Sequence, residues 1–157
     1  LGQGIVGLDF QNQRDHRKRY ANRKGMKGEQ TINQIERFSS ASGFAIWSIP
    51  VGTSIFDLGL RYDSNQVALD DRFAISEQSY ERQFSRWSPH LGLLWKSSPT
   101  TAWLISLASG FEVPALSELS ANPYGSGFNS EIQPMSFNSL DFGYRKQNPF
   151  YHWEAVA

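Results

Sequence analysis

The chain has 157 residues and no net charge, since 15 Lys and Arg balance 15 Asp and Glu. Its hydrophobic share of 39% and mean hydropathy of −0.46 lie in the range of soluble globular domains. A neutral chain has no overall field that would draw it to nucleic acid or an anionic surface, so we predict no nucleic-acid partner. The sequence also lacks Cys and any apolar run of about 18 residues, which excludes a membrane-spanning helix.

Apolar and polar residues alternate along several segments, as they do in a strand with one apolar face. No segment keeps the apolar i, i+3, i+4, i+7 stripe of a helix for long. The alternating segments are residues 6–11, 56–63, 87–96, 103–108, 140–145 and 151–155, and residues 35–49 are strand-like with an ambiguous phase. We therefore predict an all-β fold, an antiparallel up-and-down meander of roughly seven strands.

The connections between these segments alternate in length. Short turns are predicted at residues 49–53, 96–100 and 146–149, and long polar loops at about residues 14–34, 64–81 and 112–133. Outer-membrane barrels have this rhythm, with tight periplasmic turns and long extracellular loops. It predicts that the odd-numbered strands rise from the periplasm to the cell surface and that the even-numbered strands descend. The meander is then part of a large transmembrane β-barrel.

Aromatic and charged residues divide between the two faces of the predicted strands. The aromatic residues near the short turns suit an interfacial girdle, and they are Trp47, Trp95, Tyr144 and Tyr151. Apolar positions that would face lipid are Phe56, Leu58, Leu60, Leu91, Leu93, Leu140 and Phe142. Charged residues occupy the opposite face, at Asp9, Asp57, Arg61, Asp63, Lys96, Asp141, Arg145 and Glu154. These charges line either the lumen of a barrel or the solvated face of a β-sandwich.

A soluble extracellular β-sandwich or jelly-roll module is the alternative interpretation. It would bind carbohydrate or protein through loop aromatics, of which Tyr20, Tyr80, Tyr124 and Phe128 are the candidates. The two interpretations differ in the environment of the apolar face. The barrel exposes this face to lipid, whereas the sandwich buries it in a protein core.

Three sequence motifs resemble the late barrel region of TonB-dependent outer-membrane receptors. The first begins with Phe-x-x-Pro-x-x-x-Glu-Leu at residues 111–119 and closes at residues 137–145 with Leu-x-x-Gly-x-Arg. The second is Gly-Leu-Arg-Tyr-Asp at residues 59–63, and the third is Ser-Pro-x-x-Gly-Leu at residues 88–93. The motif positions are Arg61, Tyr62, Asp63, Phe111, Pro114, Glu118, Leu119, Gly143 and Arg145.

The resemblance implies a barrel of about 22 strands with a plugged lumen. It also implies TonB-energised import of scarce nutrients across the outer membrane of a Gram-negative bacterium. Residues 1–157 would then be a partial barrel domain, an internal fragment that lacks the plug and the remaining strands. The expected partners are outer-membrane lipid, the nutrient and, through the missing N-terminal region, the TonB complex.

The substrate that we expect is a ferric siderophore. Residues 111–114 and 122–124 are similar to motifs that flank a haem-ligating His in haem receptors, but no His lies between them. We therefore predict no haem ligation and no cofactor. A basic segment around residues 14–27 is a solvated loop or a site for an anionic chelate or for lipopolysaccharide phosphate. The ligand-binding candidates in the loops are Arg17, Arg19, Tyr20, Arg23, Tyr80, Tyr124 and Phe128.

Nothing in the sequence predicts an enzyme. The three His residues, at positions 16, 90 and 152, lie on separate elements without metal-ligand spacing. Asp70 and Asp71 are adjacent and indicate a loop turn. There is no P-loop, dinucleotide fingerprint, nucleophile elbow or zinc signature. We predict no catalytic residue and no metal site.

Overall fold

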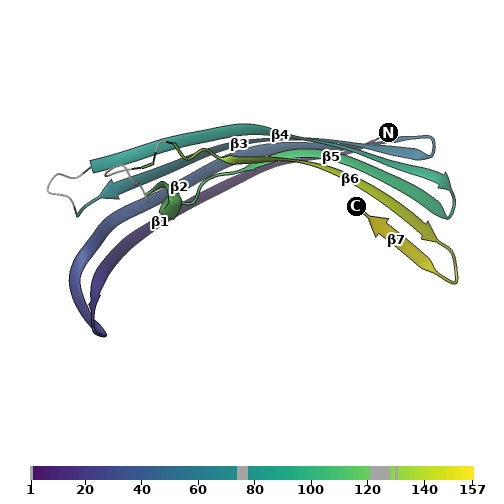
Figure 1. Cartoon of the computed structure of the whole chain (residues 1–157). Helices are drawn as coiled ribbons and strands as arrows, with labels where there is room; N and C mark the ends of the chain where they lie inside the picture. Colours follow the sequence, from purple (N-terminus) through teal and green to yellow (C-terminus); the bar gives the residue numbers. More distant parts are fainter. Residues whose placement is uncertain (1, 74–77, 121–127, 130) are drawn as a thin grey trace.

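Seven strands form one antiparallel sheet in chain order (Figure 1). The computed structural model describes residues 2–73, 78–120, 128–129 and 131–157. The strands are β1 (Gln3–Arg23), β2 (Met26–Val51), β3 (Ser54–Asp71), β4 (Gln78–Ser98), β5 (Thr101–Glu112), β6 (Met135–Gln147) and β7 (His152–Val156), with one helix, α1 (Leu116–Leu119). The sheet is curved like a section of a barrel wall, and α1 lies on its concave side. The predicted all-β meander is confirmed.

The predicted short turns are also present, together at one end of the sheet (Figure 1). Residues 52–53 connect β2 to β3, residues 99–100 connect β4 to β5, and residues 148–151 connect β6 to β7. Gly52 has a φ of 59°, a conformation that favours glycine.

Two of the predicted long loops are mostly strand in the part that the structure describes. β1 continues to Arg23 and β2 begins at Met26, so residues 14–34 form a hairpin, and the uncertain strand at residues 35–49 is part of β2. Lys24 and Gly25 both have positive φ, as a type I′ turn requires. β3 and β4 likewise extend to Asp71 and back from Gln78. These extensions lack the alternation of the apolar band because polar side chains occupy their outer face, while the backbone hydrogen bonds continue. The buried side chains of Val67, Leu69 and Phe84 lie on the inner face.

The register places the apolar side chains of adjacent strands on a shared face, which we call the outer face. Leu8 is 73% exposed there and Phe10 is 76% exposed. Exposed apolar residues of the outer face also include Val6, Trp47, Phe56, Leu58, Leu60, Leu91, Leu107, Leu140 and Phe142. A second sheet packed on this face, which the β-sandwich alternative requires, does not occur in the described part of the chain.

Aromatic residues border the apolar band of the outer face on both sides. Near the short turns, Trp95 pairs across the strands with Trp103, whose ring lies 4.7 Å from that of Tyr144. On the other side, the Tyr62 and Trp87 rings lie 4.8 Å apart. Trp87 and Trp95 are separated by about 26 Å along β4, or about 20 Å along the membrane normal at a tilt of about 40°. This height suits the apolar band of an outer-membrane barrel, which is about 25 Å tall.

The opposite, concave face, which we call the inner face, is mostly polar. All eight charged residues predicted to share a face lie on it, at the positions that alternate with the outer residues. A small buried cluster of Val67, Phe84 and Leu119 sits on this face beyond the level of Tyr62 and Trp87. Among the described residues, none of the helical segments has the length and apolar character to cross a bilayer.

Candidate functional site: a cavity on the inner face

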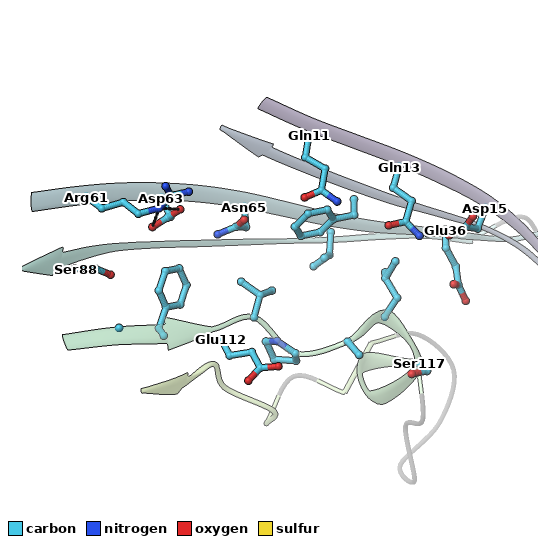
Figure 2. A pocket seen from close by; sticks show the side chains of 18 of the residues that line it. Gln11, Gln13, Asp15, Glu36, Arg61, Asp63, Asn65, Ser88, Glu112 and Ser117 are labelled. Carbon is cyan, nitrogen blue, oxygen red and sulfur yellow. Dashed lines mark hydrogen bonds and ion pairs between the residues drawn. The ribbon is translucent and has the colours of Figure 1, made fainter. Parts of the chain in front are cut away.

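A cavity of about 800 Å³ lies on the inner face, at and beyond the level of Tyr62 and Trp87. One wall consists of inward side chains of β1 to β4, and the other is the segment from Gly110 to Ser117 (Figure 2). Figure 2 shows the labelled polar side chains of the strands facing that segment across the gap. The lining residues that matter below are Gln11, Gln13, Asp15, Glu36, Phe38, Arg61, Asp63, Asn65, Ser88, Phe111, Glu112, Val113 and Pro114.

Arg61 ties three strands together at the floor of the cavity. Its Nη1 donates to Oδ2 of Asp9 on β1 at 2.8 Å, and its Nη2 donates to the Ser42 hydroxyl on β2 at 2.6 Å. Its Nε donates to Asp63 on the same strand at 2.9 Å. Two carboxylates therefore compensate this guanidinium, and its planar donor fork is occupied by the wall.

The second wall is fixed by a short helix and its buried leucine. The Glu118 carboxylate accepts a hydrogen bond from the Ala115 backbone N–H at 2.9 Å, which closes the first turn of α1. Leu119 at the end of α1 is fully buried in the cluster with Val67 and Phe84. Pro114 stands just before the helix, where its fixed φ suits the turn out of β5.

Hydrogen bonds from β4 hold the chain beyond α1 against the same wall. Arg82 Nη1 donates to the backbone carbonyl of Ile132 at 2.7 Å and to that of Asn129 at 3.1 Å. The Asn129 N–H in turn donates to the Leu119 carbonyl at 2.7 Å. The described residues of the connection between β5 and β6 thus lie against the inner face.

The predicted ligand-binding residues of the β1–β2 hairpin lie apart from the cavity. Several of its basic side chains have acidic or aromatic neighbours: Arg17 pairs with Glu36 at 3.2 Å, Arg23 with Glu29 at 2.9 Å, and the Lys27 ammonium lies 3.7 Å from the Tyr20 ring centre. Arg19 is exposed on the same hairpin. None of Arg17, Arg19, Tyr20 and Arg23 lines the cavity.

The remaining ligand-binding candidates lie on β4 and in the connection after α1. The Tyr80 and Phe128 rings lie 6.2 Å apart, and Phe128 packs against the buried cluster. Neither residue lines the cavity. Tyr124 lies outside the described residues. The structure therefore brings Tyr80 and Phe128 together and leaves the hairpin candidates elsewhere.

The positions of the sequence motifs divide among three locations. Arg61, Asp63, Phe111 and Pro114 line the cavity, while Glu118 and Leu119 hold α1 against it. Tyr62 lies on the outer face beside Trp87. Gly143 and Arg145 lie near the short turns, where Arg145 pairs with Glu154 at 2.9 Å, and a Cβ added to Gly143 would lie 3.2 Å from the Leu104 Cβ.

The sequence interpretation missed most of the polar lining. Gln11, Gln13, Asp15, Glu36 and Glu112 were not candidates, yet all of them are among the lining residues. The inward position of Gln11 could have been predicted from the alternation, because Gln11 directly follows Phe10, whose side chain points outward. For Glu112, across the cavity from the strand wall, no local pattern points to the site. No cluster of metal-ligating side chains occurs among the described residues.

Outside the apolar band, one ion pair fixes the extension of β2 to that of β3. Arg37 donates to both carboxylate oxygens of Asp70, at 2.6 and 2.9 Å. The hydrogen bond from Arg37 lowers the pKa of Asp70, and the same bond raises the pKa of Arg37, in each case against the opposing effect of burial. The pair joins the extensions of β2 and β3 on their outer face.

The geometry is that of one part of a barrel wall, with a lipid-facing apolar band, a polar inner face and a cavity toward the end opposite the short turns at residues 52–53, 99–100 and 148–151. A comparison with known families agrees with it. The sequence profile of the TonB-dependent receptor-like β-barrel matches residues 1–156. The chain therefore belongs to the TonB-dependent receptor family of transporters, and it forms part of an outer-membrane receptor barrel of a Gram-negative bacterium.

Proposed function

We propose that the receptor imports an iron chelate, most directly a ferric siderophore, and that the cavity on the inner face contributes to its capture. The observation that carries this proposal is the cavity of about 800 Å³ beyond the outer-leaflet end of the apolar band. Its volume falls within the range of about 300–1,000 Å³ found for sites that enclose one compact small molecule.

The character of the lining also supports a chelate. The lining combines the apolar side chains of Phe38, Phe111 and Pro114 with the amide side chains of Gln11 and Asn65. Such a lining suits a ligand with both hydrocarbon and hydrogen-bonding parts, as the arms of a siderophore have. Proteins bind haem iron through His, Cys, Met or Tyr. The described residues that line the cavity include none of these four types, so the lining favours a siderophore over haem.

In this proposal, transport depends on parts of the receptor outside residues 1–157. A plug domain closes the lumen, and the TonB complex supplies the energy through the N-terminal region. The role of this chain is to form wall and vestibule. The loop candidates Arg17, Arg19, Tyr20, Arg23, Tyr80, Tyr124 and Phe128 remain proposed secondary contacts along the entry path.

A binding screen of the intact receptor tests the substrate. Purified receptor is titrated with ferric siderophores, haem and cobalamin, and binding is followed through quenching of Trp fluorescence. We expect a ferric siderophore to bind and haem and cobalamin not to bind. Binding of haem or cobalamin without any siderophore would remove the substrate assignment and leave the barrel unaffected.

A further inference from the structure

The extension of β1 beyond the apolar band divides its charged residues between the two faces of the sheet. The alternation that turns Phe10 outward continues without a register shift as far as Arg19. The outward residues are Arg14, His16 and Lys18, and the inward residues are Asp15, Arg17 and Arg19. The basic segment is therefore two sets of side chains, and only the outward set continues the face that meets lipid.

The outer face of the extensions carries more cations than carboxylates. Up to the level of Lys18, the charged residues that point outward from the described parts of β1 to β4 and from the end of β3 are Arg14, Lys18, Arg37, Asp70, Arg72 and Glu81. Arg37 is bound to Asp70 at 2.6 Å, and Glu81 accepts a hydrogen bond from the Gln66 amide at 2.6 Å. Within the described ranges, no carboxylate lies within salt-bridge distance of Arg14, Lys18 or Arg72. This face therefore has a net positive charge.

Arg14 stands just outside the hydrocarbon layer of the outer leaflet. Phe10, which is 76% exposed, ends the run of outward apolar residues on β1. Arg14 follows four residues later, about 13 Å along the strand and about 10 Å along the membrane normal at a tilt of about 40°. The polar headgroups of a bilayer begin directly outside the hydrocarbon and occupy about 5 Å or more on each side. The long side chain of Arg14 is therefore within reach of headgroup phosphates.

We propose that the outer face of these extensions binds the phosphate groups of lipopolysaccharide in the outer leaflet. Arg14 lies at the level of the lipid A phosphates, and Lys18 and Arg72 lie further out, at the level of the phosphorylated sugars. Guanidinium groups bind phosphate through a planar fork of donors, and each Lys or Arg near an anionic lipid surface adds attraction.

The position of the surface selects lipid over an iron chelate. The apolar band continues directly into it, so a lipid whose chains lie against Phe10 has its headgroup beside Arg14. A chelate in the lumen is separated from these side chains by the sheet, and neither Arg14 nor Lys18 lines the cavity. The inference depends on the location of the receptor in the outer membrane and not on the substrate that it imports.

Binding of two forms of lipid A to the full receptor in detergent tests the proposal. One form carries both phosphates and the other has both removed, so the two share the same acyl chains. Dissociation constants are measured by thermophoresis of the labelled receptor. At low salt we expect the phosphorylated form to bind about tenfold tighter or more, because salt does not yet screen the cations. The preference should shrink at about 1 M salt, where charges are screened beyond about 3 Å.

A pair of double variants locates the phosphate contacts. Arg14→Gln/Lys18→Gln removes two outward cations and should lower the low-salt preference to about twofold. Arg19→Gln/Lys24→Gln is the matched control, because it removes two cations of the same hairpin, one on the inner face and one in the turn. This control should keep the preference of the wild type.

Equal binding of the two lipids by the wild-type receptor, or an equal loss of preference in both double variants, overturns the proposal. A preference that persists in Arg14→Gln/Lys18→Gln overturns it as well. Weaker binding of a ferric tris-catecholate by that variant would then assign these cations to the capture of an anionic chelate. Each of these results is independent of the screen that tests the substrate.

Discussion

Each of the longer strands has a lower part, which lies within the apolar band, and an upper part, which extends beyond it. The two parts differ in what selects the residue type at each position. Within the apolar band, β2 turns Trp47 outward and Ser48 inward, and its neighbours repeat this division. Beyond the band, the same strand carries Arg37 on one face and Glu36 on the other, and both are held by ion pairs. The backbone ladder is continuous across the boundary. Lipid therefore dictates the lower sequence, whereas individual contacts dictate the upper one.

The largest expected effect breaks a contact of the upper part. Leu119→Ala removes a fully buried side chain from the cluster with Val67 and Phe84. The substitution should cost about 2–5 kcal/mol in the docking of α1. Hydrogen exchange of the Ser120 amide, which donates to the Leu116 carbonyl at 2.9 Å, measures this loss. The exposed neighbour Ser117 is the control as Ser117→Ala, and equal protection in both variants would contradict the role of Leu119.

The next largest loss of stability is expected in the lower part, and it depends on whether the substituted side chain lies on the outer or the inner face. Leu107→Arg places a charge on the lipid side of β5 and should destabilise the barrel by about 2–4 kcal/mol. Ser106→Arg, one residue away, places it on the polar inner face, where it should cost little beyond the hydrogen bond to His90. Urea unfolding of the full receptor in bilayers compares the two variants. Equal destabilisation by the two substitutions would contradict the conclusion that one face contacts lipid and the other contacts water.

An intermediate effect is expected at the boundary between the two parts. Arg61→Gln leaves the carboxylates of Asp9 and Asp63 without their shared cation and should cost about 1–2 kcal/mol. Arg61→Lys keeps the charge but lacks the fork that reaches three partners, so it should lie between Gln and wild type. The free energy of unfolding of the receptor measures the series. A Lys variant less stable than the Gln variant would reject the geometric account of Arg61.

The smallest effect depends on pH in the upper part. Arg37 lowers the folded-state pKa of Asp70, so the stabilisation is present above the ordinary pKa of an Asp and is lost as the pH falls through the lowered value. Arg37, whose pKa is raised, stays charged throughout this range. We expect a loss of about 1 kcal/mol or less between about pH 4 and 2, measured by hydrogen exchange in the β2 and β3 extensions. Asp70→Asn should abolish the dependence, and a persisting one would assign it elsewhere.

The lower part could be predicted from the sequence and the upper part only in fragments. Alternation at residues 56–63 or 140–145 indicated strands because lipid requires apolar side chains on every second residue. Residues 14–34 looked like a loop because a strand that stands in water has no such requirement. The ion pairs of that region were also hidden, since a basic segment shows its charges but not its cross-strand acids, Glu36 among them.

For the cavity, the sequence predicted only which residues of a single strand share a face. The alternation assigned Arg61 and Asp63 to one face, but Arg61 meets Asp9 across 52 positions of the chain through the register of three strands. The position of the wall formed by residues 110–117 depends on the inward fold of the connection after β5. The register of distant strands and the burial of Leu119 therefore determine which residues line the cavity. Neither of them can be predicted from a local sequence pattern.

Spin-label accessibility along β5 tests the central claim, that one face of this sheet meets lipid and the other a hydrated lumen. Single labels at residues 103 to 108 of the full receptor in bilayers are probed with oxygen, which partitions into lipid, and with a water-soluble nickel complex. The structure predicts oxygen accessibility at the odd positions and nickel accessibility at the even positions. The same accessibility at neighbouring positions, or the opposite phase, would contradict the account.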